Sequence, residues 1–253
     1  NENKVVQITD DLDELNIANF GFAAGTTIAV VAKEGLPFGT FKGNNFKYND
    51  QGQVIVADTG FPVYADEDQY LGNFQPDYIA SFGLNAQYKG FGIRALLDMK
   101  KGGLFASQTK FSGEFNGTTV NTTIYNREPF IIPNSVVDNG DGTFSENTVQ
   151  ITEQDYYTNY DVPASTHLID ASYVKLREVE LSYTFPKKLL DNTFITNARL
   201  AIYGKNLYYW LPDENKYADP EVNGPALTGN AQGLETTQTP SQRSLGLSVQ
   251  LTF

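Results

Sequence analysis

Apolar and polar residues alternate without a break over the last nine positions of the chain. The apolar members are Leu245, Leu247, Val249, Leu251 and Phe253. Successive side chains of a β-strand point to opposite faces, so this pattern predicts a strand with one apolar and one polar face. The last strand of a soluble β-sandwich is the alternative interpretation. The polar positions carry no charge after Arg243, and the final residue is aromatic, and both features argue against that alternative.

The same period of two recurs earlier in the chain. It is clear over residues 79–88, 91–100, 173–185 and 198–209, and weaker over 26–33. Only Lys89-Gly90 separates the first two segments, which predicts a two-residue hairpin with glycine at a positive φ angle.

Two strands are expected to be irregular. The apolar positions of 173–185 change phase at Arg177-Glu178, which predicts a β-bulge. The segment 198–209 is interrupted near Gly204. Residues 10–17 are interpreted as one short helix.

The predicted strands are joined by connections that alternate strictly between short and long. Residues 89–90 and about 186–197 form short connections, whereas 34–78, 101–172 and 210–242 form long ones. Outer-membrane barrels have short periplasmic turns and long extracellular loops, so the sequence predicts an all-β, antiparallel transmembrane barrel. Tyr208-Tyr209-Trp210 then falls at the outer end of its strand, where an aromatic girdle is expected; an aromatic core cluster is the alternative.

About six spanning strands are predicted, whereas closed bacterial barrels have at least about eight. Open strand edges are not tolerated in lipid, so six strands cannot close a barrel by themselves. The chain is therefore expected to be part of a larger barrel and not to form a closed barrel when it is expressed alone.

Composition excludes several classes of protein. The 18 Lys and Arg residues against 30 Asp and Glu residues give a net charge of −12, which argues against nucleic-acid binding and a polybasic membrane anchor. The chain has no Cys and one His, His167, so thiol chemistry and Cys- or His-based metal sites have little basis. No apolar run is long enough for a transmembrane helix.

Three candidate chemical motifs are weak, and we expect no enzyme, cofactor-binding residue or metal site. Residues 90–95 match the dinucleotide pattern G-x-G-x-x-A but lie in a predicted hairpin. Ser165, His167 and Asp170 have the residue types of a catalytic triad, but they are crowded into one loop. Asp138 and Asp141 flank Gly140 in a Gly-rich turn that lacks the full ligand set of a calcium loop, and the sequence leaves calcium binding open.

Tyrosines are frequent in the long connections: Tyr125, Tyr156, Tyr157, Tyr160 and Tyr217. They suit stacking against sugars, gripping of peptides, or packing against a partner protein. The sequence does not decide between these roles, and the substrate-binding residues stay unassigned.

Five segments in order resemble the SusC/RagA-type TonB-dependent transporters of the bacterial outer membrane. They are 34–43 (EGLPFGTFKG); 71–78 (LGNFQPDY) with 88–91 and 98–103; 170–179 (DASYVKLREV) with 183–187; 204–207 (GKNL) with 219–221 and 229–233; and 240–244 (PSQRS). Order and spacing agree from about residue 34 to the last residue.

This resemblance implies that residues 1–253 are the carboxyl-terminal part of a barrel of about 22 strands with long extracellular loops. It implies a plug and a TonB box in a missing amino-terminal region, through which the TonB complex would act, and a SusD-like surface lipoprotein as partner. The implied function is import of oligosaccharides or peptides across the outer membrane. A structural scaffold within an outer-membrane complex is the alternative.

The terminal strand also resembles the assembly signal of outer-membrane barrels. Leu247, Val249, Leu251 and Phe253 would supply this signal, with membrane lipids and the barrel assembly machinery as partners. The alternative is that Phe253 only anchors the strand at the membrane interface, as girdle aromatics do.

Overall fold

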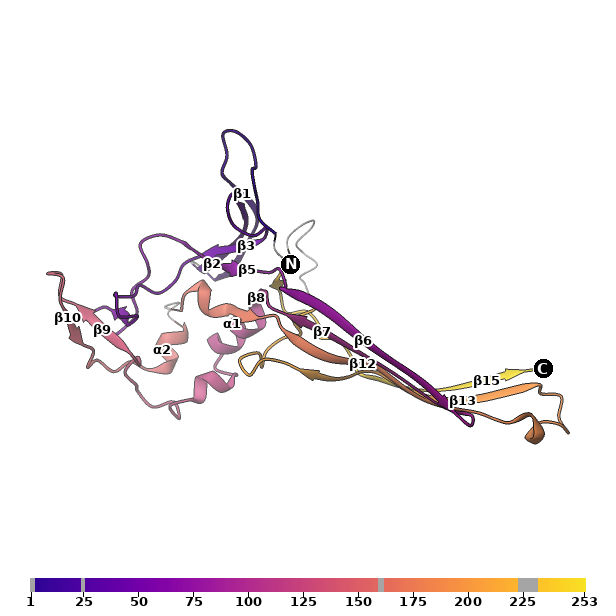
Figure 1. The fold of residues 1–253 in the computed structure, drawn as a ribbon. Helices are drawn as coiled ribbons and strands as arrows, with labels where there is room; N and C mark the ends of the chain where they lie inside the picture. Colours follow the sequence, from indigo (N-terminus) through magenta and orange to yellow (C-terminus); the bar gives the residue numbers. More distant parts are fainter. Residues whose placement is uncertain (1–2, 24–25, 159–161, 223–231) are drawn as a thin grey trace. The chain divides into compact units, whose positions relative to one another are not determined.

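The computed structural model describes residues 3–23, 26–158, 162–222 and 232–253. The chain divides into two compact units (Figure 1). We call Pro76–Gly102, Ala171–Asp213 and Thr239–Phe253 the strand unit, and Asn1–Gln75, Gly103–Asp170 and Glu214–Gln238 the loop unit. No helix within the described ranges has the length and apolar composition needed to cross a bilayer.

The strand unit is one antiparallel sheet of five strands in the order β15-β13-β12-β7-β6. The strands are β6 (Tyr78–Tyr88), β7 (Phe91–Lys101), β12 (Tyr173–Thr184), β13 (Asn197–Trp210) and β15 (Ser244–Thr252). A short 3₁₀ helix, η3 (Lys187–Leu189), lies in the connection from β12 to β13. The predicted strands of this sheet, including the adjacency of 173–185, 198–209 and 243–253, are confirmed.

Strand register aligns like residues in rows across the sheet. One row consists of Ala86, Ile93, Leu181, Ile202 and Leu247. The next row on that face consists of Tyr88, Phe91, Tyr183, Leu200 and Val249. The row between them on the opposite face consists of Gln87, Gly92, Ser182, Ala201 and Ser248. The alternation in the sequence thus becomes one apolar face, with the small and polar residues on the other.

Both predicted irregularities are confirmed. The register of β12 shifts between Leu176 and Glu178 against both of its neighbours. On β13 the partner changes from Tyr208 to Lys205 across the same step, and Asn206 takes a φ of +51°, so the irregularity lies just beyond Gly204. These extra residues keep the apolar side chains on one face on either side of the bulge.

The turn between β6 and β7 has the backbone that its sequence predicts. Lys89 and Gly90 have φ angles of +48° and +89°, as a two-residue hairpin requires. The candidate dinucleotide motif at 90–95 therefore continues directly into β7 and opens no helix, which confirms its rejection.

The loop unit contains three small sheets and two helices. The first sheet has the order β1-β2-β3-β5, formed by β1 (Glu14–Ala23), β2 (Thr26–Lys33), β3 (Thr40–Gly43) and β5 (Gln69–Asn73). The second is β10-β9-β4, formed by β4 (Val54–Val56), β9 (Ser135–Asp138) and β10 (Phe144–Glu146). The third is β11-β8-β14, formed by β8 (Leu104–Ser107), β11 (Leu168–Asp170) and β14 (Leu234–Glu235). The helices are α1 (Gln108–Phe115) and α2 (Glu153–Thr158), with the 3₁₀ turns η1 (Val120–Thr123) and η2 (Ala164–His167).

A hydrophobic core holds the loop unit together. Its buried members are Phe22, Ile28, Val30, Phe41, Phe74, Ala106, Ala164 and Leu234. They come from segments far apart in the sequence, so the long connections are folded onto one another. Gly39 is required beside this core, because its φ is +80° and a Cβ there would lie 2.0 Å from the Phe74 ring.

Two sequence expectations are wrong: the short helix over residues 10–17, and the inclusion of 26–33 among the spanning strands. Residues 10–17 do not form a helix: a turn leads into β1, whose hydrogen bonds to β2 outweigh the local pattern. The segment 26–33 is a strand, but it pairs with β1 and β3 and not with the five long strands. One face of this strand is buried, and its residues Ile28 and Val30 belong to the loop-unit core. The long connections also contain short strands and helices, which the sequence pattern did not predict.

Candidate functional site

The apolar face of the strand unit is the main candidate surface. Leu245, Leu247 and Val249 are 79%, 65% and 60% exposed within the described chain, and Phe82 and Ile202 are also exposed. Soluble monomers rarely leave a continuous apolar patch larger than a few hundred Å² in water. This face therefore requires an apolar neighbour.

Aromatic residues lie toward both ends of this face. Tyr208 and Trp210, at the end of β13, are 53% and 49% exposed and have ring centroids 4.8 Å apart. Their exposure excludes the interpretation of a buried aromatic core cluster. At the other end, the rings of Phe91 and Tyr183 are 4.6 Å apart, and Tyr88 lies in the same row.

The distance between the aromatic ends is close to the height of the apolar band of a transmembrane barrel. The rows from Trp210 to Tyr88 cover residues 80–88 of β6, a length of about 27 Å at about 3.4 Å per residue. A strand tilt of about 40° reduces this to about 21 Å, comparable with the apolar band of about 25 Å in transmembrane barrels. Aliphatic residues fill the rows between the aromatic ends, as the lipid-facing wall of a barrel requires.

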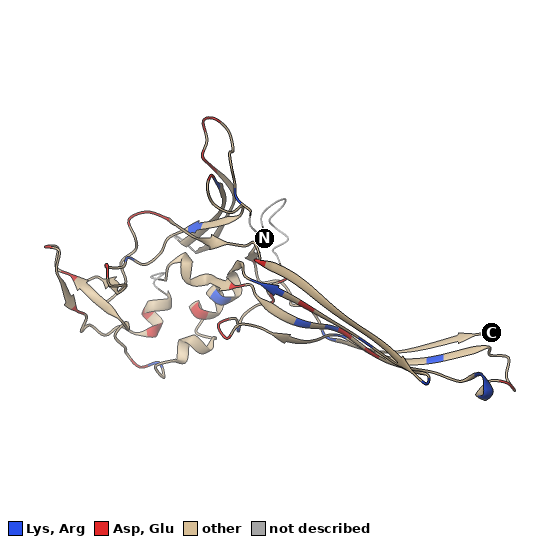
Figure 2. Ribbon diagram, in the orientation of Figure 1, with Lys and Arg blue, Asp and Glu red and all other residues tan. Residues whose placement is uncertain are grey.

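The opposite face carries most of the polar residues of the sheet, and two ion pairs join neighbouring strands there. Arg177 Nε lies 2.5 Å from Asp98 Oδ2, and Ser81 donates a hydrogen bond to Asp98 at 2.7 Å. Arg199 pairs with Glu180 on the neighbouring strand. In Figure 2 the coloured charged positions follow one another along the strands of this sheet. A polar face of cross-strand pairs suits a water-filled lumen.

A buried lysine, Lys175, lies on the polar face near the start of β12. Lys175 is 1% exposed, and its ammonium group donates hydrogen bonds to the Tyr209 hydroxyl and, at 3.1 Å, to Ser241 Oγ. Its Nζ also lies 4.1 Å from the centroid of the Tyr209 ring. These contacts hold the chain before β15 against β13 and compensate the desolvation of the charge. The sequence signal was weak, because Lys175 is one polar residue in an alternating strand.

The tyrosines of the long connections pack mainly within the loop unit. Tyr125 stacks on Phe130 at 4.4 Å, and Phe130 contacts Tyr156, which in turn contacts Tyr157. Burial raises the pKa of Tyr217 to about 12 and the pKa of Tyr157 further still. Tyr160 lies outside the described residues. The ring contacts of Tyr125, Tyr156 and Tyr157 favour internal packing over an outward-facing grip on a ligand, and Tyr217 is half-buried.

No protein-family model matches the chain. Two TonB-dependent receptors of Formosa agariphila are similar to it: receptor P3 is 23% identical over 100% of the chain, and receptor P26 is 26% identical over 82% of it. The chain spans 26% and 19% of the length of these receptors.

Solved structures of the RagAB peptide transporter have a similar fold. One matches 99% of the chain with a TM-score of 0.64 and 18% identity, and a RagAB peptide importer in the open-open state matches with a TM-score of 0.60 and 17% identity. The chain corresponds to 26% and 25% of these proteins. The resemblance to the SusC/RagA-type TonB-dependent transporters is confirmed.

The TonB-dependent transporter fold explains the two faces of the sheet. The antiparallel sheet of five strands, with one apolar and one mostly polar face, fits a segment of a transmembrane barrel wall. The similar proteins are receptors and transporters and not enzymes.

In this fold the residues predicted as an assembly signal occupy the edge strand of the sheet. Leu247, Val249 and Leu251 lie on the apolar face of β15, which pairs with β13. Phe253 follows the strand and stacks on Phe194 of the β12–β13 connection, with ring centroids 5.5 Å apart and planes 15° apart. The ring contact provides a local packing role beside the predicted recognition role, and the two roles can be separated by experiment.

Deletion of Phe253 is expected to reduce the amount of full-length protein in the outer membrane without greatly changing the melting of the molecules that insert. Assembly would lose its recognition residue, whereas the finished sheet would lose one exposed aromatic contact worth at most roughly 1.5–3 kcal/mol. Abundance is measured by quantitative immunoblotting of membrane fractions, and melting by heat-modified electrophoretic mobility.

Phe194→Ala is the matched control, because it removes the stacking partner and keeps Phe253. Normal abundance of Phe194→Ala is expected. Normal abundance of the Phe253 deletion, with clearly lowered melting, would instead support a role as an interface anchor.

The candidate triad does not exist in the structure. His167 is 1% exposed and packs against Phe22 and Phe111, with ring centroids 4.8 and 5.2 Å away. Neither of its ring nitrogens has a hydrogen-bond partner in the described part of the chain, and Ser165 donates its hydroxyl to Asn45 at 2.7 Å. The three residues therefore cannot act as nucleophile, base and orienting acid.

His167 is neutral in the folded loop unit. Burial, and secondarily the nearby positive charge of Lys110, lower its pKa to about 3. Its Nδ1 lies 3.7 Å from Glu114 Oε2, which is longer than a hydrogen bond, and burial raises the pKa of Glu114. The contact is thus between a neutral imidazole and a carboxyl group whose neutral form is favoured, and not an ion pair.

Acidification to about pH 5 is expected to weaken the loop unit by up to about 2 kcal/mol through His167. The unfolded imidazole takes up a proton below about pH 6.5, whereas the folded one resists until about pH 3, so stability is complete above pH 6.5 and falls as the pH falls. The raised pKa of Glu114 acts in the opposite direction and offsets part of this loss.

His167→Phe tests this pH dependence, because phenylalanine suits the aromatic surroundings and cannot be protonated. Hydrogen exchange of the full-length protein, corrected for intrinsic rates, should show that the variant loses less protection on acidification than the wild type. Equal losses in both proteins would contradict the assignment to His167.

Asp138 and Asp141 form the turn that their glycines predict. Asp138 accepts a hydrogen bond from the Gly140 amide, and Asp141 accepts one from the Thr143 amide, both at 2.9 Å. The Thr143 hydrogen bonds lower the pKa of Asp141. The described residues contain no group of three or more His, Cys, Asp or Glu side chains arranged to hold a metal ion.

Proposed function

We propose that residues 1–253 are the carboxyl-terminal barrel portion of a TonB-dependent importer of the SusC/RagA type, integral to a bacterial outer membrane. The single observation that carries this proposal is the five-stranded sheet with an apolar and a charge-paired face, in a chain whose fold matches the RagAB transporter over 99% of its length. In this role the apolar face contacts lipid and the other face lines the lumen. The proposed activity is transport and not enzymatic catalysis, and it requires no cofactor.

The substrates proposed are oligosaccharides or peptides. One of the structures with a similar fold is the RagAB peptide transporter, and this similarity supports peptides as a candidate substrate class. The loop unit, with its tyrosines and acidic residues, is proposed to form the extracellular side, where a SusD-like lipoprotein covers the entrance. Coupling to the TonB complex is proposed for the whole protein and not for these 253 residues.

Uptake by cells tests the proposal. A strain without the gene is compared with the same strain carrying the full-length gene, and each receives fluorescently labelled peptides and labelled oligosaccharides of several sizes. We expect uptake of one class to require both the gene and an intact TonB complex, and a surface lipoprotein to purify with the transporter.

Unchanged uptake of every substrate in the strain without the gene would contradict an importer. If other outer-membrane components were then lost from the membrane, the scaffold role would be supported instead. Disruption of TonB in the strain with the gene is the control that separates active import from passive leakage.

A further inference from the structure

Three lysines lie in the two short connections at one end of the strand unit, the short-turn end. Lys89 lies in the β6–β7 turn, and Lys187 and Lys188 lie in η3; all three are exposed. The Thr184 amide donates a hydrogen bond to the Gly90 carbonyl at 2.8 Å, so the hairpin turn lies beside the end of β12, from which η3 follows directly. Figure 2 shows η3 in blue at this end of the sheet.

Few acidic groups accompany these lysines. Over residues 86–92 and 182–196 the charged residues are Lys89, Lys187, Lys188 and Asp191. Glu180 is paired with Arg199 on the polar face. The opposite end of the sheet is different, because Asp77 and Lys101 carry both signs there. The short-turn end is therefore the positive end of the sheet.

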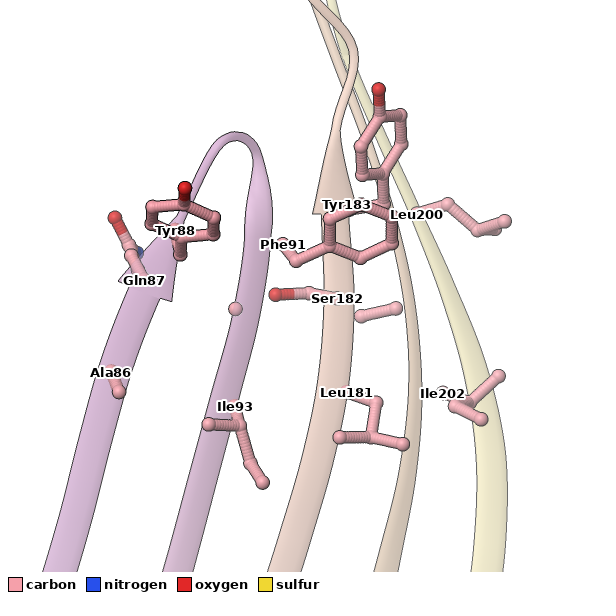
Figure 3. A pocket seen from close by; sticks show the side chains of 12 residues that line it. Ala86, Gln87, Tyr88, Phe91, Ile93, Leu181, Ser182, Tyr183, Leu200 and Ile202 are labelled. Atoms are coloured by element: carbon pink, nitrogen blue, oxygen red, sulfur yellow. The ribbon is translucent and has the colours of Figure 1, made fainter.

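An apolar groove begins beside the β6–β7 turn, which holds Lys89, and follows the apolar side of the sheet. It has a volume of about 530 Å³, and its apolar side chains in Figure 3 come from β6, β7, β12 and β13, whereas Gln87 and Ser182 belong to the row of the opposite face. Tyr88 and Phe91 stand near the hairpin, whereas Ile93, Leu181 and Ile202 lie farther along the strands. Lys89 Nζ lies 5.2 Å from the centroid of the Tyr88 ring, so a cation stands at the aromatic end of the groove.

These observations fix the chemistry of an occupant. The groove favours a flexible hydrocarbon chain, and the lysines favour a negatively charged group at one end of that chain. A free phosphate satisfies only the lysines, and a zwitterionic lipid satisfies mainly the groove. We infer that this end of the sheet selectively binds an anionic phospholipid, with an acyl chain along the groove and the phosphate near Lys89, Lys187 and Lys188.

This inference rests on the proposed membrane placement and adds a lipid preference to it. Each lysine near an anionic headgroup is worth about fivefold in affinity. Phosphatidylglycerol should therefore be retained by the wild-type protein at least about tenfold more strongly than phosphatidylcholine with the same acyl chains. The lipid is proposed as a bound ligand that undergoes no reaction.

Native mass spectrometry of the full-length transporter tests the lysines. The protein is taken from nanodiscs with equal amounts of dioleoyl-phosphatidylglycerol and dioleoyl-phosphatidylcholine, and the retained lipids are counted. The variant Lys89→Gln/Lys187→Gln/Lys188→Gln should lose most of the preference for phosphatidylglycerol. The control Lys4→Gln/Lys101→Gln/Lys216→Gln has the same change of net charge at exposed lysines elsewhere and should keep it.

A second pair of variants tests the groove. Ala86→Phe fills the groove and should reduce retention of phosphatidylglycerol, whereas Ala80→Phe, on the same face and strand but outside the groove, should not. Millimolar glycerol phosphate should compete poorly, because it lacks acyl chains.

Three outcomes would overturn the inference: equal retention of both lipids by the wild type, equal losses in the two lysine variants, or efficient competition by glycerol phosphate. Membrane fractionation keeps this test apart from the proposed function. A protein that is absent from the outer membrane contradicts the membrane proposal, whereas an inserted protein without lipid preference contradicts only the inference.

Discussion

Leu84→Arg should lower the free energy of unfolding of the inserted full-length protein by about 2–4 kcal/mol, because it places a charge in lipid near the middle of the membrane. Leu84 is the fourth of six apolar-face positions on β6 (residues 78–88) and is 44% exposed, so an arginine there would project from the apolar face. Equilibrium unfolding in urea, from vesicles of defined composition, measures the change.

Gln87→Arg is the matched control on the same strand. Gln87 lies on the opposite face and is exposed, so its substitution should change stability by no more than about 0.5 kcal/mol. Equal costs at the two positions would mean that the apolar face does not contact lipid.

Phe41→Ala should destabilise the loop unit by about 3–5 kcal/mol, because it removes a large buried ring and leaves a cavity. Phe41 is 0% exposed and belongs to the core that joins β2, β3 and the segment after β5. The chain has no cysteine, so a single cysteine at the buried position Ala106 can report opening of this core through its rate of thiol labelling.

Phe144→Ala is the control for the Phe41 substitution, because Phe144 lies in the loop unit but is 41% exposed. Labelling of Ala106→Cys should accelerate strongly with Phe41→Ala and change little with Phe144→Ala. Similar labelling rates in the two variants would show that Phe41 does not hold the core closed.

The long strands were predictable because their alternation of apolar and polar residues appears within each short segment of the sequence. Each residue of β6, β7, β12, β13 or β15 faces either an apolar or a polar environment, so a period of two appears in the sequence itself. The bulge at Arg177-Glu178 was visible for the same reason, since an extra residue changes the phase of the alternation.

The loop unit was not predictable because its pairings are non-local. β4 pairs in parallel with β9, and β14 pairs in parallel with β8, each across a long stretch of sequence. Strands of two to four residues are too short to show a period. Residues 10–17 were misassigned for a related reason: hydrogen bonding to β2 decides their conformation.

The candidate sites divide in the same way. The sequence identified Leu247, Val249, Leu251 and Phe253 as one group, but only the fold placed Phe194 against Phe253. Likewise, the lysines at 89 and 187–188 are separated by about a hundred positions in the sequence and lie at the same end of the sheet, where the β6–β7 turn hydrogen-bonds to the end of β12.

The sequence by itself therefore determined the strand unit: its strands, their two faces, the tight hairpin and the resemblance to TonB-dependent transporters. These features depend on alternation and turn chemistry, which act between residues close in the chain. Only the tertiary structure decided the core of the loop unit, the burial of His167 and the groove beside the three lysines. Those features arise where distant segments meet, and the free energy of such contacts depends on which residues the fold brings together.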